Sequence, residues 1–92
     1  MRVYHFSEQA YFPAWDESAL TLRVTYPNRK CDPHVAADLF HRYYDEWQLC
    51  DELGLDVMLN EHHQTATCMS SSVVIGLAVL SRITKKDRKS VV

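Results

Sequence analysis

The sequence has few glycines and cysteines, and each shortage excludes a class of site. Only Gly54 and Gly76 are present among the 92 residues, so a glycine-rich loop that cradles phosphate is excluded. Cys31, Cys50 and Cys68 are an odd number at wide spacings, which fits neither a disulfide framework nor a paired-cysteine zinc site. Reduced thiols are the simplest interpretation, and we therefore expect a cytoplasmic protein.

The sequence also lacks an excess of one charge and a long apolar run. Ten basic and twelve acidic side chains give a formal net charge of -2 without a large basic block, so we expect no binding of nucleic acid through its phosphates. The most apolar stretch, residues 73–80, is broken by Gly76 and is far shorter than the roughly 18 residues of a membrane span. Residues 1–10 are polar and charged where a signal peptide requires an apolar stretch. We expect no membrane partner.

What is present is the composition of a globular domain. A hydrophobic content of 47% with 24% charged residues is typical of folded chains and not of disordered ones. A chain of 92 residues forms at most one small domain with a modest core.

The best-marked element is a helix that begins after Asp32 and ends before Gly54. Asp32 is a favourable N-cap residue, and Pro33 falls at the first helical position, where its missing N–H costs nothing. Gly54 can adopt the left-handed conformation that ends a helix. Apolar residues recur at helical spacing on one face, which predicts packing against a core: Ala36, Leu39, Phe40, Tyr43, Trp47, Cys50 and Leu53.

Two strands flank this helix. Residues 2–7 are rich in β-branched and aromatic types and predict the first strand. Residues 55–60 predict a second strand with apolar residues on both faces, which is typical of a parallel sheet covered by helices. The long connection at 8–31 contains a further stretch, 20–26, that alternates enough to be extended.

The remainder continues the alternation of strands and helices. Residues 72–84 predict a second, almost wholly apolar helix, capped by Ser70, Ser71 or Ser72. The final residues, KSVV, predict the start of a third strand. The order of elements predicts an α/β fold with two consecutive βαβ units, parallel strands and right-handed crossovers.

The segment Asn-Glu-His-His at 60–63 is the main candidate for a functional site. Ligands of parallel α/β folds bind beyond the carboxyl ends of the strands, so we expect residues 7–9 and 60–63 to be neighbours on one rim of the sheet. A carboxylate, Glu61, beside the imidazoles of His62 and His63 suits general acid–base chemistry. The alternative is that these polar residues only tie down the backbone of a loop.

Other chemistries fit this segment less well. Adjacent histidines in an extended segment point to opposite sides, and the helical i, i+4 spacing is absent, so we expect no metal site and give little weight to a small hydrolase or metalloprotein. The serines at 70–72 favour a helix cap over a nucleophile, because no GxSxG pattern surrounds them. Cys68 is more typical of a small buried residue than of a reactive thiol.

Two segments carry a resemblance to a known family. RVYHFSEQAY and CDPHVAADLFHRYYDEWQLCDELGLDVMLNEHH, followed by a serine-rich cap, an apolar helix and a TKK segment, resemble the N-terminal part of the bacterial luciferase-like, flavin-dependent monooxygenases. The likeness spans about residues 2–92, and its most specific part is EHH at the end of the second strand. It implies a (β/α)8 TIM barrel whose C-terminal rim binds reduced FMN, which reacts with O2 and oxygenates a small organic substrate. Some relatives use a deazaflavin instead.

The resemblance also implies roles for three residues. His62 matches the catalytic histidine that acts as a base, Glu61 matches the acidic residue near the flavin ring, and His63 matches the second histidine of the motif. We add Ser7, Glu8 and Ser70 as candidate cofactor-binding residues from their expected place on the rim alone.

The length departs from the family, because an eight-stranded barrel needs roughly 200–250 residues. Residues 1–92 hold the first two βα units and the start of the third strand, so we expect an N-terminal fragment that is inactive or nearly so alone. Its open sheet edges and apolar helix faces favour self-association. The alternative is a small non-catalytic α/β interaction module that acts as an oligomer or with a partner through the helix at 72–84.

Overall fold

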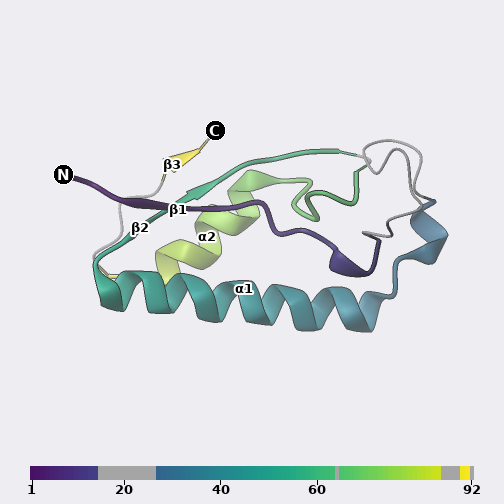
Figure 1. The fold of residues 1–92 in the computed structure, drawn as a ribbon, viewed down its shortest axis with the longest axis horizontal. Helices are drawn as coiled ribbons and strands as arrows, with labels where there is room; N and C mark the ends of the chain where they lie inside the picture. Colours follow the sequence, from purple (N-terminus) through teal and green to yellow (C-terminus); the bar gives the residue numbers. More distant parts are fainter. Residues whose placement is uncertain (15–26, 64, 86–89, 92) are drawn as a thin grey trace.

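The computed structural model describes residues 1–14, 27–63, 65–85 and 90–91. The predicted extended piece at 20–26 lies outside these residues. The described residues form three strands, two helices and two short 3₁₀ turns at Phe12–Ala14 and Asn28–Lys30 (Figure 1). In chain order the longer elements are β1 (Tyr4–Ser7), α1 (Pro33–Leu53), β2 (Asp56–Leu59), α2 (Val73–Ile83) and β3 (Ser90–Val91).

The sheet has the order β1-β2-β3, and both pairings are parallel. Tyr4 lies opposite Asp56 and Ser7 lies opposite Leu59, so β1 and β2 end together at the same edge. The predicted α/β fold with parallel strands is confirmed. Strands consecutive in sequence are also neighbours in space, with α1 between β1 and β2 and α2 between β2 and β3 (Figure 1).

Both helices cover the same face of β2. Trp47 of α1, Val57 and Leu59 of β2, and Leu80 of α2 are fully buried in one cluster. Gly76 brings α2 close to this cluster, because a Cβ atom there would lie 2.8 Å from Cδ1 of Leu59 and 3.8 Å from the Trp47 ring. The core therefore sits in the layer between the helices and the sheet.

Helix α1 has the bounds that its sequence predicts. Oδ1 of Asp32 accepts the backbone N–H groups of His34 at 2.9 Å and of Val35 at 3.4 Å. At the other end Gly54 has a φ of 79°, the left-handed conformation. The predicted burial of Leu53 is wrong, since Leu53 is 66% exposed. The last turn instead directs Asp51 inward, where its Oδ2 accepts the backbone N–H of residue 85 at 3.0 Å.

The opposite face of the sheet is only partly covered by the described residues. Tyr4 and Phe6 of β1 lie on it, 39% and 46% exposed, beside Asp56 and the half-buried Met58 of β2. Arg2 forms an ion pair with Asp56 at its border. Neither described helix is both long enough and apolar enough to cross a membrane.

Candidate functional site

The segments that follow β1 and β2 meet at one rim, as the sequence predicts. Nδ2 of Asn60 donates to Oε1 of Glu8 at 3.3 Å. The carbonyl of Gln9 accepts the backbone N–H of Met69 at 2.8 Å, so the serine-rich segment lies against the chain that leaves β1. The polar residues at the carboxyl ends of both strands are therefore within reach of one another.

Glu61 caps helix α2 from across the loop. Its Oε1 accepts the backbone N–H of Val73 at 2.8 Å, and its Oε2 lies 3.1 Å from Nε2 of His63. The hydrogen bond from Val73, followed by the one to His63, lowers the pKa of the Glu61 carboxyl below its usual value. The carboxylate is thus engaged by the protein itself.

The prediction that a serine caps α2 is confirmed in position but not in its hydrogen bond. Ser72 occupies the N-cap position, but its side chain makes no capping hydrogen bond. The hydroxyl of Ser70 instead donates to the carbonyl of Ser72 at 3.4 Å. The physical reason is that the ionised carboxylate of Glu61 already accepts the first N–H of the helix, and an anion is favoured at that end.

The two histidines of the motif differ in their surroundings. His63 is bound to Glu61, whereas the exposed imidazole of His62 has no hydrogen-bond partner among the described residues. The backbone N–H of His62 donates to the carbonyl of Ser70 at 3.1 Å, which fixes the loop. His62 is therefore the member of the motif whose side chain is available for chemistry.

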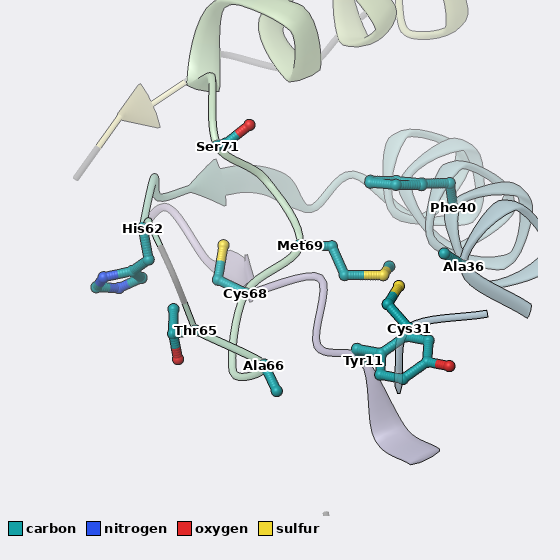
Figure 2. Close-up of a pocket in the computed structure, with 10 residues that line it drawn as sticks. All are labelled: Tyr11, Cys31, Ala36, Phe40, His62, Thr65, Ala66, Cys68, Met69 and Ser71. Carbon is teal, nitrogen blue, oxygen red and sulfur yellow. The ribbon is translucent and has the colours of Figure 1, made fainter. Parts of the chain in front are cut away.

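His62 lines a half-open cavity of about 260 Å³. Figure 2 shows the His62 ring at one end of the lining group, with Tyr11, Cys31 and Phe40 at the other. The hydroxyl of Tyr11 accepts the backbone N–H of Asp32 at 2.9 Å, so this wall is anchored to the start of α1. The lining is mainly apolar, and the His62 ring at its edge points away from the other lining side chains (Figure 2).

Cys68 also lines this cavity but is unsuited to be a nucleophile. Its thiol is buried, with Sγ 3.5 Å from Oδ1 of Asn60. Burial raises the pKa of the Cys68 thiol, so the reactive thiolate is disfavoured. The side chain packs as a small buried residue.

The remaining candidate residues are dispersed. Ser7 is 4% exposed and lines a different cavity, between β1 and α1. Ser70 is buried and bonded to its own loop, while Glu8 is exposed and bonded to Asn60. The residues that sequence reasoning missed are Tyr11 and Phe40, because only the folded loop brings them to the cavity of His62.

The described residues do not by themselves fit FMN. The cavity is smaller than the roughly 300–1,000 Å³ of pockets that enclose a drug-sized ligand. Among the residues that the structure describes, no lysine or arginine lines it to hold a phosphate. Within the described part of the chain, no group of three His, Cys, Asp or Glu side chains could hold a metal ion.

Comparison of the chain with protein-family models, curated proteins and solved structures gives no match.

Proposed function

We propose that the chain is the N-terminal portion of a flavin-dependent monooxygenase that uses reduced FMN and O2 to oxygenate a small organic substrate. By itself the chain is inactive or nearly so. The observation that carries this proposal is His62, whose imidazole has no hydrogen-bond partner among the described residues and stands at the edge of a cavity at the carboxyl end of a parallel sheet.

The order of the elements supports a partial (β/α)8 TIM barrel. In such a barrel each strand pairs with the next one along the chain, and all helices lie on the outer side. The order β1-β2-β3, with both helices against one face of β2, has the same arrangement. The partly exposed face with Tyr4 and Phe6 would then point to the interior of the barrel.

In this proposal His62 handles a proton and Glu61 positions the loop that carries His62. His62 holds or accepts a proton at an imidazole nitrogen, because an imidazole can both accept and donate a proton and no described side chain competes for the ring. Glu61 is a positioning residue, because its hydrogen bonds with Val73 and His63 hold the loop that carries His62. The flavin itself would be held mainly by residues outside these 92.

The test is to read the gene in all three frames beyond the codon of Val92 and to express any continuation that completes a barrel. We expect the complete protein to bind FMN and His62→Ala to lower coupled oxygenation on the order of 10²-fold with FMN affinity retained. His41→Ala, an exposed histidine of α1, is the matched control. Unchanged turnover in His62→Ala would show that the assigned role is wrong.

A second candidate is a non-catalytic interaction module that associates with a second copy. The observation in its favour is the partly uncovered sheet face, since parallel sheets are normally buried on both sides.

A further inference from the structure

Asn60 is a buried polar residue directly after β2 and two positions before His62. Only 5% of it is exposed. A buried amide is costly unless its polar atoms find hydrogen-bond partners. Both polar atoms of the Asn60 side chain have one, and the two partners come from different segments of the chain. Asn60 therefore joins parts of the rim that are far apart in sequence.

The two partners decide which way the amide of Asn60 points. Glu8 follows β1, and because an ionised carboxyl group can only accept, Nδ2 of Asn60 donates to its Oε1 at 3.3 Å. Oδ1 of Asn60 accepts from the thiol of Cys68, with Sγ at 3.5 Å. Asparagine supplies one donor and one acceptor, whereas an aspartate would supply two acceptors and a leucine neither. The residue type therefore matches its surroundings.

Cys68 extends this contact to the backbone of His62. Sγ of Cys68 also lies 3.6 Å from the carbonyl oxygen of Ser70, so the thiol can donate to either oxygen. Burial raises the pKa of the Cys68 thiol, so the thiol keeps the proton that it donates. The same carbonyl of Ser70 accepts the backbone N–H of His62 at 3.1 Å. The contacts thus run without a gap from Glu8 through Asn60 to His62.

We propose that Asn60 is a positioning residue, which holds the backbone of His62 through Cys68 and the carbonyl of Ser70. Glu61 holds the same loop from the side of α2, whereas Asn60 holds it from the side of β1. The exposed imidazole of His62 has no hydrogen-bond partner among the described residues, so its place depends on its backbone. The inference rests on the proposed role of His62, but the contact itself can be tested without turnover.

The test exchanges donor and acceptor between Asn60 and Glu8 in the 92-residue chain. Asn60→Asp places a second carboxylate against that of Glu8, and the two like charges should break the contact. Adding Glu8→Gln restores it, because the introduced amide can donate to the introduced carboxylate. The rate at which the backbone amide of His62 exchanges with solvent, measured by NMR, reports whether its bond to Ser70 holds.

We expect the His62 amide to exchange about 5- to 10-fold faster in Asn60→Asp, the factor expected for the loss of one hydrogen bond. The double variant should return to the wild-type rate. The amide of Thr84, bonded to the carbonyl of Leu80 at the end of α2, should keep its rate in every variant. Gln48→Glu makes the same change of amide to carboxylate at an exposed position of α1 and should alter neither rate.

Cys68 supplies a second pair of variants. Cys68→Ala removes the donor to the carbonyl of Ser70 and should also accelerate exchange at His62, whereas Cys68→Ser keeps a donor and should not. In the complete protein, Asn60→Asp should lower coupled oxygenation by about tenfold or more with FMN affinity retained, because a displaced catalytic group reacts more slowly.

Four results would overturn the inference. These are an unchanged exchange rate at His62 in Asn60→Asp, an acceleration that the double variant does not reverse, an equal acceleration at Thr84, and full oxygenation by the complete Asn60→Asp protein. If Asn60→Asp does not fold, a double variant with wild-type exchange supports the contact, and one that also fails to fold refutes it. A complete wild-type protein that does not oxygenate would refute the proposed function, while reversible acceleration at His62 would still confirm that Asn60 holds it.

Discussion

At the scale of single residues, Glu61 shows how a motif can be recognised while one of its contacts is missed. The sequence predicts that Glu61 lies beside two histidines at the end of a strand, and this follows from local order alone. The bond to Val73 joins residues twelve positions apart and depends on how the intervening loop folds. Local rules therefore favoured the serines as the cap, because they stand next to the helix.

The first prediction concerns the pH dependence that Glu61 confers. Its pKa is lowered in the folded chain from a usual value of 4.5, so the stabilisation is present above that pH and is lost as the pH falls through the lower, folded value. Glu61→Gln keeps an acceptor but removes the charge. We expect its melting temperature to lie below that of the wild type at neutral pH and to converge with it in acid.

Thermal melts followed by circular dichroism between neutral and strongly acidic pH measure this convergence. Glu52→Gln, on the exposed side of α1, is the matched control for removing one carboxylate. A parallel displacement of the two curves at every pH would contradict the role of the Glu61 charge.

At the scale of elements, helix α1 was predictable because all of its signals are local. The first turn is marked by the N-cap residue and the proline that follows it, and the last turn is marked by the terminal glycine. Each of these residues lies next to the helix end that it determines. The inward direction of Asp51 was not predictable, because its partner is the backbone of residue 85 beyond α2. The apolar run predicted the position of α2. It did not predict that Val74 and Ile75 are exposed, because their exposure depends on which elements surround the helix.

The second prediction tests the cap of α1. Asp32→Ala removes the acceptor of two backbone N–H groups and should lower the free energy of unfolding by about 1 kcal/mol. Chemical denaturation measures the change. Asp45→Ala, in the exposed part of the same helix, should have a smaller effect. An equal loss of unfolding free energy in the two variants would show that the capping hydrogen bonds of Asp32 do not stabilise the helix.

The third prediction tests the contact between α2 and the sheet. Gly76→Ala raises helix propensity by about 1 kcal/mol, but its methyl group would meet Cδ1 of the fully buried Leu59 at 2.8 Å. Overpacking of a core costs about 1–3 kcal/mol, so we expect a net loss of stability of about 1 kcal/mol.

Leu59→Val shortens the side chain that the new methyl group meets and supplies the control. In the double variant the two changes should cost less than their sum, because they share one contact. If the changes in unfolding free energy measured by chemical denaturation are strictly additive, Leu59 is not the residue that restricts the space for a side chain at position 76.

At the scale of the whole molecule, both helices pack against one side of the sheet, and the described residues cover the other side only in part. Sequence periodicity placed the two βα units and their parallel order, but it could not show how much of the other face remains exposed. That face carries Tyr4 and Phe6 beside Met58, with Arg2 and Asp56 paired at its border. Because the ion pair leaves no net charge there, two copies can approach face to face without repulsion from it.

The fourth prediction follows from this face. We expect the 92-residue chain to self-associate as its concentration rises, and Phe6→Glu to weaken that association by about tenfold or more, because it places a charge in the centre of an apolar contact. Light scattering coupled to size-exclusion chromatography measures the mass.

Val74→Glu, on the exposed side of α2, is the matched control, because the sequence alone predicted the helix at 72–84 as the contact surface. If Val74→Glu abolishes association and Phe6→Glu does not, that prediction is right and the sheet face is not the interface. A wild-type chain that stays monomeric throughout would leave the second candidate function without support, and the apolar residues of this face would then be explained by the barrel interior alone.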